Sequence, residues 1–174
     1  MPDVVDGGAW GYAIIDSTCC FVADTAILLD FNGNTKPIQD IKAGDKVISY
    51  NIFKQEFYEV VVNQLIIHEN TTDLAIVTFG DGRTLEMNEY HPLYTINGFH
   101  SITNYKGYDT LKVGDIVKSF DGWHEIINIE RYKVDKPIIT YNIGIKNFDE
   151  MVDDDTNDTF VANGFVAHNA PCMT

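Results

Sequence analysis

The chain of 174 residues is 45% hydrophobic and 12% aromatic, which is enough for one well-buried core and little more. Acidic residues outnumber basic ones by 26 to 12, and the formal net charge of -14 disfavours binding to nucleic acids and to anionic membranes. No apolar run approaches the roughly 20 residues of a membrane span, and residues 1–18 lack the basic start and apolar centre of a signal peptide. We therefore expect one soluble, monomeric domain without nucleic-acid or membrane partners.

The chain contains short turn signals that indicate a β protein. Residues 1–18 carry several glycines without periodicity, and we interpret them as a flank outside the fold. From Phe21 onward, short apolar runs are separated by Asn-Gly or Asp-Gly pairs, which favour hairpins because both residues tolerate positive φ. These pairs are Asn32-Gly33, Asp81-Gly82, Asn97-Gly98, Asp121-Gly122 and Asn163-Gly164. The helical candidate is about one turn at residues 37–44, which opens with Pro and ends with Gly, so the predicted fold class is all-β.

An internal repeat organises the chain. Residues 40–50 read Asp-Ile-Lys-Ala-Gly-Asp-Lys-Val-Ile-Ser-Tyr, and residues 110–120 read Thr-Leu-Lys-Val-Gly-Asp-Ile-Val-Lys-Ser-Phe. The copies lie about 70 residues apart. Each is followed by an aromatic-rich turn and then by two apolar strands, predicted at residues 59–67, 74–79, 125–130 and 138–143.

Each half then reaches a histidine, His91 in the first and His168 in the second. Two similar halves predict a pseudo-two-fold β structure that brings both histidines near a common axis, together with Cys20 at the start of the repeat. The other two cysteines, Cys19 and Cys172, complete neither a disulfide framework nor a Cys-x-x-Cys metal knuckle. A free thiol with chemistry of its own is the more interesting interpretation.

The sequence predicts no cofactor and no metal. Asp153–Asp155 belongs to an acidic stretch that lacks the ligand alternation and the glycine of a calcium-binding loop. We interpret this stretch as a solvated loop.

The C-terminal hairpin ends in a pair of residues that can carry out a specific reaction. Its returning strand finishes with His168-Asn169. The amide nitrogen of an asparagine side chain can attack its own main-chain carbonyl, closing a succinimide and releasing the next residue, while the imidazole protonates the departing amine. The pattern alone also fits a His-Asn pair that only bonds to nearby backbone.

Four motifs together resemble the Hint superfamily of inteins, Hedgehog autoprocessing domains and bacterial intein-like domains. Cys20-Phe-Val-Ala-Asp-Thr-Ala-Ile-Leu-Leu29 is similar to the first motif, a Cys with a Thr five residues on, and Ile41-Lys-Ala-Gly-Asp-Lys-Val47 is similar to the recurrent Gly-Asp-x-Val segment. Glu86-Met-Asn-Glu-Tyr-His-Pro-Leu-Tyr94 resembles the second motif, and Phe160-Val-Ala-Asn-Gly-Phe-Val-Ala-His-Asn169 the closing one. The resemblance covers nearly all of residues 20–169 and implies a horseshoe-like Hint fold.

Four positions depart from the family's pattern. Asn88 stands where inteins usually carry Thr, and its amide donates hydrogen bonds in a different geometry. The family often has Asp and His at the positions of Asn142 and Asp158, although Asp158 is itself a candidate base. Ala170 follows Asn169, where inteins need Cys, Ser or Thr as a second nucleophile. Since the chain also has no endonuclease-sized insertion, it most resembles the type A bacterial intein-like domains.

The resemblance implies an autocatalytic domain at residues 20–169, flanked by residues 1–19 and 170–174. Cys20 attacks the carbonyl of Cys19 in an N-to-S acyl shift that turns the peptide bond into a thioester. The partners are then the domain's own flanking segments, with external thiols or water as acyl acceptors, and the cellular location follows the host protein.

Each remaining site residue has an implied role. His91 is the candidate that protonates the departing amine of Cys20 and distorts the peptide bond, and Asn88 the candidate that polarises the carbonyl. Asn169 cyclises, assisted by His168, and cleaves the chain before Ala170. The products are N-terminal and C-terminal fragments, with low-level splicing as a minor route.

Three alternatives stay open. The chain can be a β-rich binding module that has lost autoprocessing. It can also be a Hedgehog-like domain that passes the acyl group to an external alcohol, although the His168-Asn169 ending speaks against that chemistry. Cys172, three residues past Asn169, is a possible off-register nucleophile.

Overall fold

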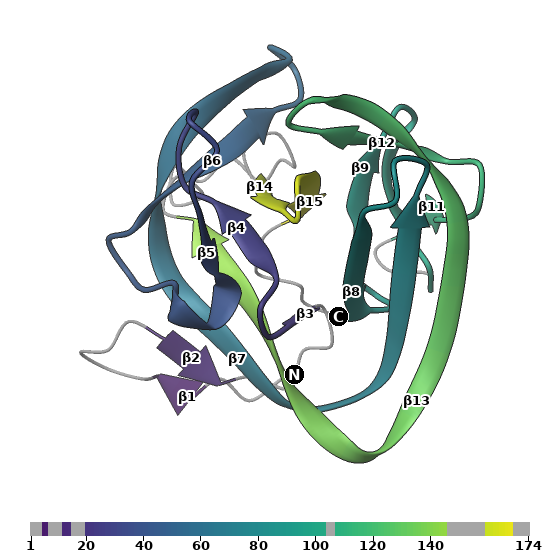
Figure 1. Ribbon diagram of the computed structural model, residues 1–174. Coiled ribbons are helices and arrows are strands. Elements are labelled where there is room, and N and C mark those ends of the chain that lie inside the picture. Colours follow the sequence, from purple (N-terminus) through teal and green to yellow (C-terminus); the bar gives the residue numbers. More distant parts are fainter. Residues whose placement is uncertain (1–4, 7–11, 15–19, 104–106, 146–158, 169–174) are drawn as a thin grey trace.

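The computed structural model describes residues 5–6, 12–14, 20–103, 107–145 and 159–168 (Figure 1). Its strands, in chain order, are β1 (Val5–Asp6), β2 (Tyr12–Ile14), β3 (Phe21–Val22), β4 (Ala26–Leu28), β5 (Thr35–Pro37), β6 (Lys46–Asn51), β7 (Glu56–Phe79), β8 (Thr84–Asn88), β9 (Leu93–Thr95), β10 (Gly98–Ser101), β11 (Asp109–Thr110), β12 (Ile116–Ser119), β13 (Gly122–Ile145), β14 (Thr159–Ala162) and β15 (Phe165–His168). The one helical segment among these residues is a 3-10 turn, η2 (Ile38–Asp40), within the predicted range. The prediction of an all-β fold is confirmed.

Two long strands, β7 and β13, hold the fold together. Each has 24 residues, and they pair antiparallel along most of their length. Figure 1 shows them curving around the molecule, with the short strands β14 and β15 between them. The predicted strands at 59–67 and 74–79 are therefore parts of one strand, as are those at 125–130 and 138–143.

The internal repeat is visible as two turns with the same hydrogen bonds. Gly44 N–H donates to the carbonyl of Val62 at 2.9 Å, and Gly114 N–H donates to that of Ile126 at 2.8 Å. The aspartate after each glycine accepts a bond from a lysine main-chain N–H three residues earlier, at 3.0 Å in both copies. Both glycines have φ above +90°, a region that side chains rarely adopt. The predicted pseudo-two-fold structure is confirmed at this level.

All five Asn-Gly or Asp-Gly pairs lie where one strand turns into its antiparallel neighbour. The pairs join β4 to β5, β7 to β8, β9 to β10, β12 to β13, and β14 to β15. At the last hairpin, Asn163 and Gly164 have φ of 50° and 95°. The Asn163 side chain also accepts from Ala26 N–H at 2.7 Å and donates to the Thr84 carbonyl at 3.0 Å, which ties the hairpin to β4 and β8.

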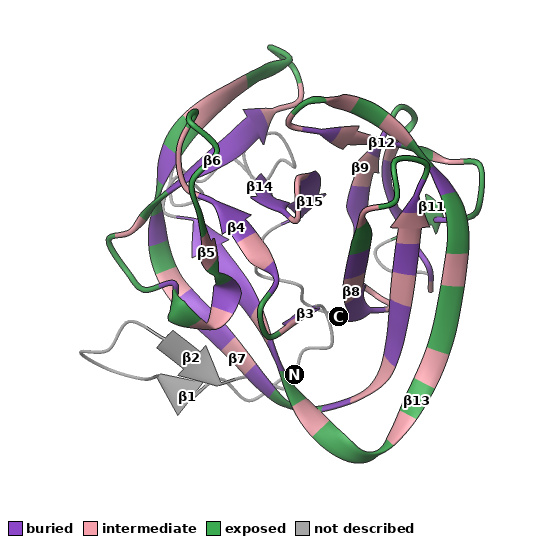
Figure 2. Cartoon of the chain, viewed as in Figure 1, coloured by how far each residue is buried: buried purple, intermediate pink, exposed green. Residues whose placement is uncertain are grey.

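The hydrophobic core surrounds this C-terminal hairpin. Every residue of β14 and β15 is buried (Figure 2). Phe165 stacks on Phe79 with ring centroids 3.6 Å apart, and Phe160 meets Phe21 edge to face at 5.8 Å. The last hairpin therefore lies at the centre of the fold, and β3, the first strand of the predicted domain, packs against its strand β14.

Part of the predicted N-terminal flank belongs to the sheet. β2 pairs in parallel with residues 65–67 of β7, and β1 pairs with β2. The interpretation of residues 1–18 as lying outside the fold is thus wrong for residues 5–6 and 12–14, because β7 offers an edge to which β2 bonds and β1 in turn pairs with β2. Within the described residues, no helix has the length and apolar character needed to span a membrane.

Candidate functional site

One turn of the chain bonds to both ends of the predicted domain. The turn runs from Asn88 to His91 and is closed by His91 N–H donating to the Asn88 carbonyl at 3.1 Å. Asn88 N–H donates to the carbonyl of Cys20 at 2.9 Å. The Nε2 of His91 is 2.9 Å from the carbonyl oxygen of His168. Since a carbonyl oxygen only accepts, this bond requires the proton on Nε2.

The side chain of Asn88 supports that turn. Its Oδ1 accepts from Tyr90 N–H at 2.8 Å, and its Nδ2 donates to the Asp73 carbonyl at 3.0 Å. Asn88 is buried. These contacts of the Asn88 side chain hold the turn, and the polarising role expected from the sequence stays a prediction.

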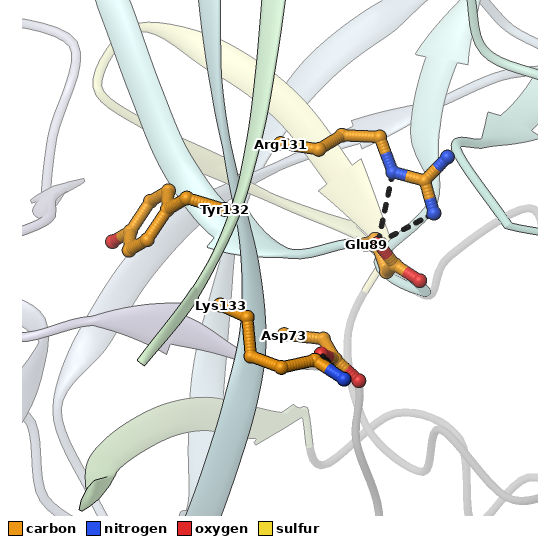
Figure 3. A pocket seen from close by; sticks show the side chains of 5 residues that line it. All are labelled: Asp73, Glu89, Arg131, Tyr132 and Lys133. Atoms are coloured by element: carbon orange, nitrogen blue, oxygen red, sulfur yellow. Dashed lines mark hydrogen bonds and ion pairs between the residues drawn. The ribbon is translucent and has the colours of Figure 1, made fainter. Parts of the chain in front are cut away.

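An ion pair at the surface connects the same turn to β13. Figure 3 shows an open pocket beside it, where the carboxylate of Glu89 receives two bonds from Arg131 at 2.8 and 3.0 Å. In the same pocket, Nζ of Lys133 lies 3.4 Å from Oδ1 of Asp73. Tyr132 points to the other side of β13. Both acidic groups of this pocket are thus paired with basic ones. The pair between Glu89 and Arg131 links the turn to β13.

His91 lies in an aromatic environment. It is fully buried, with its ring centroid 4.1 Å from that of Phe21 and 6.4 Å from that of Phe160. Phe21 directly follows Cys20 in the chain, so His91 contacts the first strand by packing and the last strand by a hydrogen bond. The structure therefore brings Cys20 and His168 close to His91, as predicted.

The thiol of Cys20 is fully buried. Burial disfavours the thiolate and raises the pKa of Cys20 to about 12, although a hydrogen bond from Thr140 partly opposes this shift. Such a thiol is almost entirely protonated at neutral pH. Any reaction that uses it as a nucleophile needs a group that takes its proton.

His168 occupies the end of β15 and is held on both sides. Its N–H donates to the carbonyl of Pro92 at 3.1 Å. Its buried ring meets Phe99 edge to face at 5.0 Å and Tyr108 at 6.4 Å. These contacts fix the backbone from which residue 169 continues.

Several predicted residues lie outside the described part of the chain. They are Cys19, Asp158, Asn169, Ala170 and Cys172. Asn142, which stands where the family often has Asp, is described: it is buried in β13, and its side-chain oxygen accepts from the N–H of Ile143 at 2.8 Å. The structure thus brings together Cys20, Asn88, His91 and His168.

Sequence reasoning missed a second polar cluster next to Cys20. It consists of His68, Thr71 and Thr140, all buried. The available signal was a polar run, His-Glu-Asn-Thr-Thr-Asp at residues 68–73, between the two predicted apolar strands. Pairing across strands decides which of these polar residues turns inward, and the sequence does not display that pairing.

The fold and the shared turn define a domain of the Hint class, the fold of the self-processing inteins. The sequence matches the family described as the pretoxin HINT domain over residues 28–170. The chain belongs to this family. No curated protein matches it.

Solved structures agree with this assignment. A bacterial intein-like domain from Clostridium thermocellum is 30% identical, with a TM-score of 0.71 over 88% of this chain and 100% of that one. A DnaB intein from Synechocystis sp. PCC 6803 is 16% identical, with a TM-score of 0.68 over 87% and 99%. The gp41-1 intein is 21% identical, with a TM-score of 0.64 over 86% and 98%. The two inteins share the fold, and the bacterial intein-like domain also supports the family.

Proposed function

We propose that this domain cleaves the polypeptide that carries it, by a thioester at Cys20 and by cyclisation of Asn169. The observation that carries the proposal is the shared turn: Asn88 N–H bonds to the Cys20 carbonyl, and His91 Nε2 bonds to the His168 carbonyl. A single rigid element thereby positions the residues next to both junctions. Intramolecular placement of this kind is worth about 7–11 kcal/mol relative to the same groups free in solution.

At the N-terminal junction, the Cys20 sulfur attacks the carbonyl carbon of Cys19. The S–C bond forms, the C–N bond breaks, and the amine of Cys20 takes up a proton, for which His91 is the proposed donor. Its packing against Phe21 supports this assignment. Water or a small thiol then takes the acyl group and releases residues 1–19.

At the C-terminal junction, the side-chain nitrogen of Asn169 attacks its own carbonyl carbon. A succinimide forms, and the amine of Ala170 leaves with a proton, for which His168 is the proposed donor. The bond from His91 to the His168 carbonyl supports a second role for His91, which is to fix the backbone that precedes Asn169. Asp158 stays a candidate base.

The identity of residue 170 determines whether the two cleavages can be coupled into splicing. A methyl side chain cannot attack the thioester, so the branched intermediate that couples the two cleavages in splicing does not form. We propose that separate cleavages predominate, that residues 20–169 are the processing unit, and that residues 1–19 and 170–174 are its flanks. The family description, pretoxin HINT domain, is consistent with a domain that frees a neighbouring segment.

Intact mass spectrometry of freshly made protein tests the proposal. With dithiothreitol, the wild-type chain should release residues 1–19, and with time it should lose the segment after Asn169. Cys20→Ala should abolish the first event and leave the second. Asn169→Ala should leave the release of residues 1–19 intact and abolish the loss of the segment after residue 169. A wild-type chain that keeps its full mass under these conditions would be a binding module and not a processing domain.

A further inference from the structure

A chain of hydrogen bonds leads from the Cys20 sulfur to a buried imidazole. Thr140 pairs with Val22 of β3, two residues from Cys20, and its hydroxyl hydrogen-bonds to the Cys20 thiol. The Thr140 hydroxyl is 2.6 Å from that of Thr71, which in turn is 2.6 Å from Nδ1 of His68. All four side chains are at most 2% exposed, so bulk water has little access to this path.

A β-bulge in β7 makes this path possible. Ile138 pairs with Thr71 and Thr140 pairs with His68, so β13 advances two residues where β7 advances three. In a regular strand, residues three apart point to opposite faces. The extra residue lets His68 and Thr71 point to the same side, while the two residues between them, 69 and 70, are exposed.

The same three bonds suit both ionisation states of the thiol. With a neutral thiol, each group can donate towards the imidazole: sulfur to Thr140, Thr140 to Thr71, and Thr71 to an unprotonated Nδ1. With a thiolate, every bond reverses, and a protonated Nδ1 donates to Thr71 at the far end. Because a hydroxyl both donates and accepts, neither state leaves a member of the path without its bond.

We propose that His68 takes the proton of Cys20 through the hydroxyls of Thr140 and Thr71 when the thiol attacks. This inference rests on the proposed function, because it assigns the base for the acyl shift. Thr140 touches the reacting sulfur and is a catalytic residue in this scheme. Thr71 and His68 act through it.

The proton balance of the step is complete. The S–H bond of Cys20 breaks and an N–H bond forms at His68 Nδ1, while each threonine passes on its own proton and takes the one behind it. The sulfur then forms its bond to the Cys19 carbonyl carbon. The departing amine receives a proton from a separate donor, His91, so that the base acts from β7 and the acid from the turn between β8 and β9. A separate base fits the high pKa that burial gives the thiol.

The test compares variants of the full 174-residue chain by the rate of release of residues 1–19 at saturating dithiothreitol. His68→Asn keeps a polar atom near the position of Nδ1 but cannot take a proton, and Thr71→Val removes the hydroxyl at almost constant shape. We expect both variants to release residues 1–19 about 10²-fold more slowly or worse, as for loss of a general base. Thr71→Ser restores the hydroxyl and should cleave close to the wild-type rate.

The second junction supplies the internal control. Cleavage after Asn169 should keep its wild-type rate in all three variants, because its chemistry does not use this path. Wild-type release of residues 1–19 by His68→Asn or Thr71→Val would overturn the proposal, as would a Thr71→Ser variant as slow as Thr71→Val. Equal slowing at both junctions would show a general distortion and also count against it. A wild-type chain without thiol-dependent release is a different result, which refutes the proposed function itself.

Discussion

The thiol of Cys20 is fully buried, and this burial changes how it titrates. Its pKa rises from the ordinary value of 9.0 to about 12 because burial penalises the thiolate. A group whose protonated form is favoured in the folded state contributes stability that is fully present below its unfolded pKa. That contribution is lost as the pH rises through the window between the two values.

This shift predicts a specific alkaline loss of stability. The free energy of unfolding of uncleaved protein should fall between pH 9 and 12, and Cys20→Ser should flatten this fall because a serine hydroxyl does not titrate there. Urea unfolding of both proteins at pH 7, 9 and 10.5 measures the difference. The buried Tyr50 and the partly buried Tyr94, whose pKa values desolvation also raises, are common to both proteins, so their contributions cancel. Parallel pH curves would show that the thiol is not held in its neutral form.

The side chain of His91 contacts both described ends of the predicted domain, Phe21 by packing and His168 by a hydrogen bond. His91→Ala removes the bond to the His168 carbonyl and the packing on Phe21, so it should slow both cleavages. His168→Ala should slow only the release that follows Asn169, by an amount in the range of about 10² to 10⁴ typical of a general acid. Mass spectrometry of the two fragments in each variant gives all four rates. Equal rates of N-terminal release in wild type and His91→Ala would remove His91 from the first step.

Among the elements, the β14–β15 hairpin is the one that the rest of the fold closes around. Gly164 has φ +95° and faces Arg83, whose guanidinium lies 4.6 Å from the ring centroid of Phe165. A Cβ at residue 164 would meet that guanidinium, and Arg83 is held in turn by Asp81 and Asp121. The turn is therefore restricted both by its backbone and by a neighbouring side chain.

Gly33 supplies a matched control for this hairpin. It has φ +89°, but a Cβ there would meet nothing within 4 Å. Gly33→Ala should destabilise by about 1–2 kcal/mol, the cost of a side chain in a left-handed conformation, and Gly164→Ala by more, because Arg83 must also move. The midpoints of urea unfolding compare the two. A smaller loss for Gly164→Ala would mean that Arg83 swings away at no cost.

The sequence was informative wherever local chemistry decides the structure. The Asx-Gly pairs identified five hairpins because positive φ is a local demand, and the repeat identified the two matched turns. The length of β7 was not predictable in this way. The polar residues Asn70 and Thr71 interrupt its apolar pattern, so it read as two strands.

The same limit applies to the candidate site. Motif spacing identified Cys20, His91 and His168, and the structure brings them together. His68 escaped notice because its inward direction depends on a bulge that is defined by pairing with β13. Long-range pairing of this kind leaves no periodic trace in a single strand.

At the scale of the whole molecule, the fold brings Cys20 and His168 to one region, although they are far apart in the chain. Cys20 directly precedes β3, His168 lies at the end of β15, and both bond to the turn that begins at Asn88. Since a single turn holds Cys20 and His168 close together, the same geometry suits joining the flanks as well as cutting them. Under the proposed function, what this chain lacks is a nucleophile at residue 170.

Ala170→Cys supplies that nucleophile. Exchange of an acyl group between two similar thiols is nearly thermoneutral, so a thiol held close to the thioester at Cys20 should capture the N-terminal flank before water does. Cyclisation of Asn169 would then release the thioester-linked flanks from the domain. The freed amine of residue 170 would take the acyl group from its own sulfur and form a peptide bond. We expect the ratio of ligated flanks to separate fragments to rise, measured by mass spectrometry with longer reporter flanks. Ala170→Val is the matched control, because it adds bulk without a nucleophile and should leave the ratio low. If Ala170→Cys gave the same ratio as Ala170→Val, the shared turn would be too loose to bring residue 170 to the thioester, and cutting alone would be the function of this geometry.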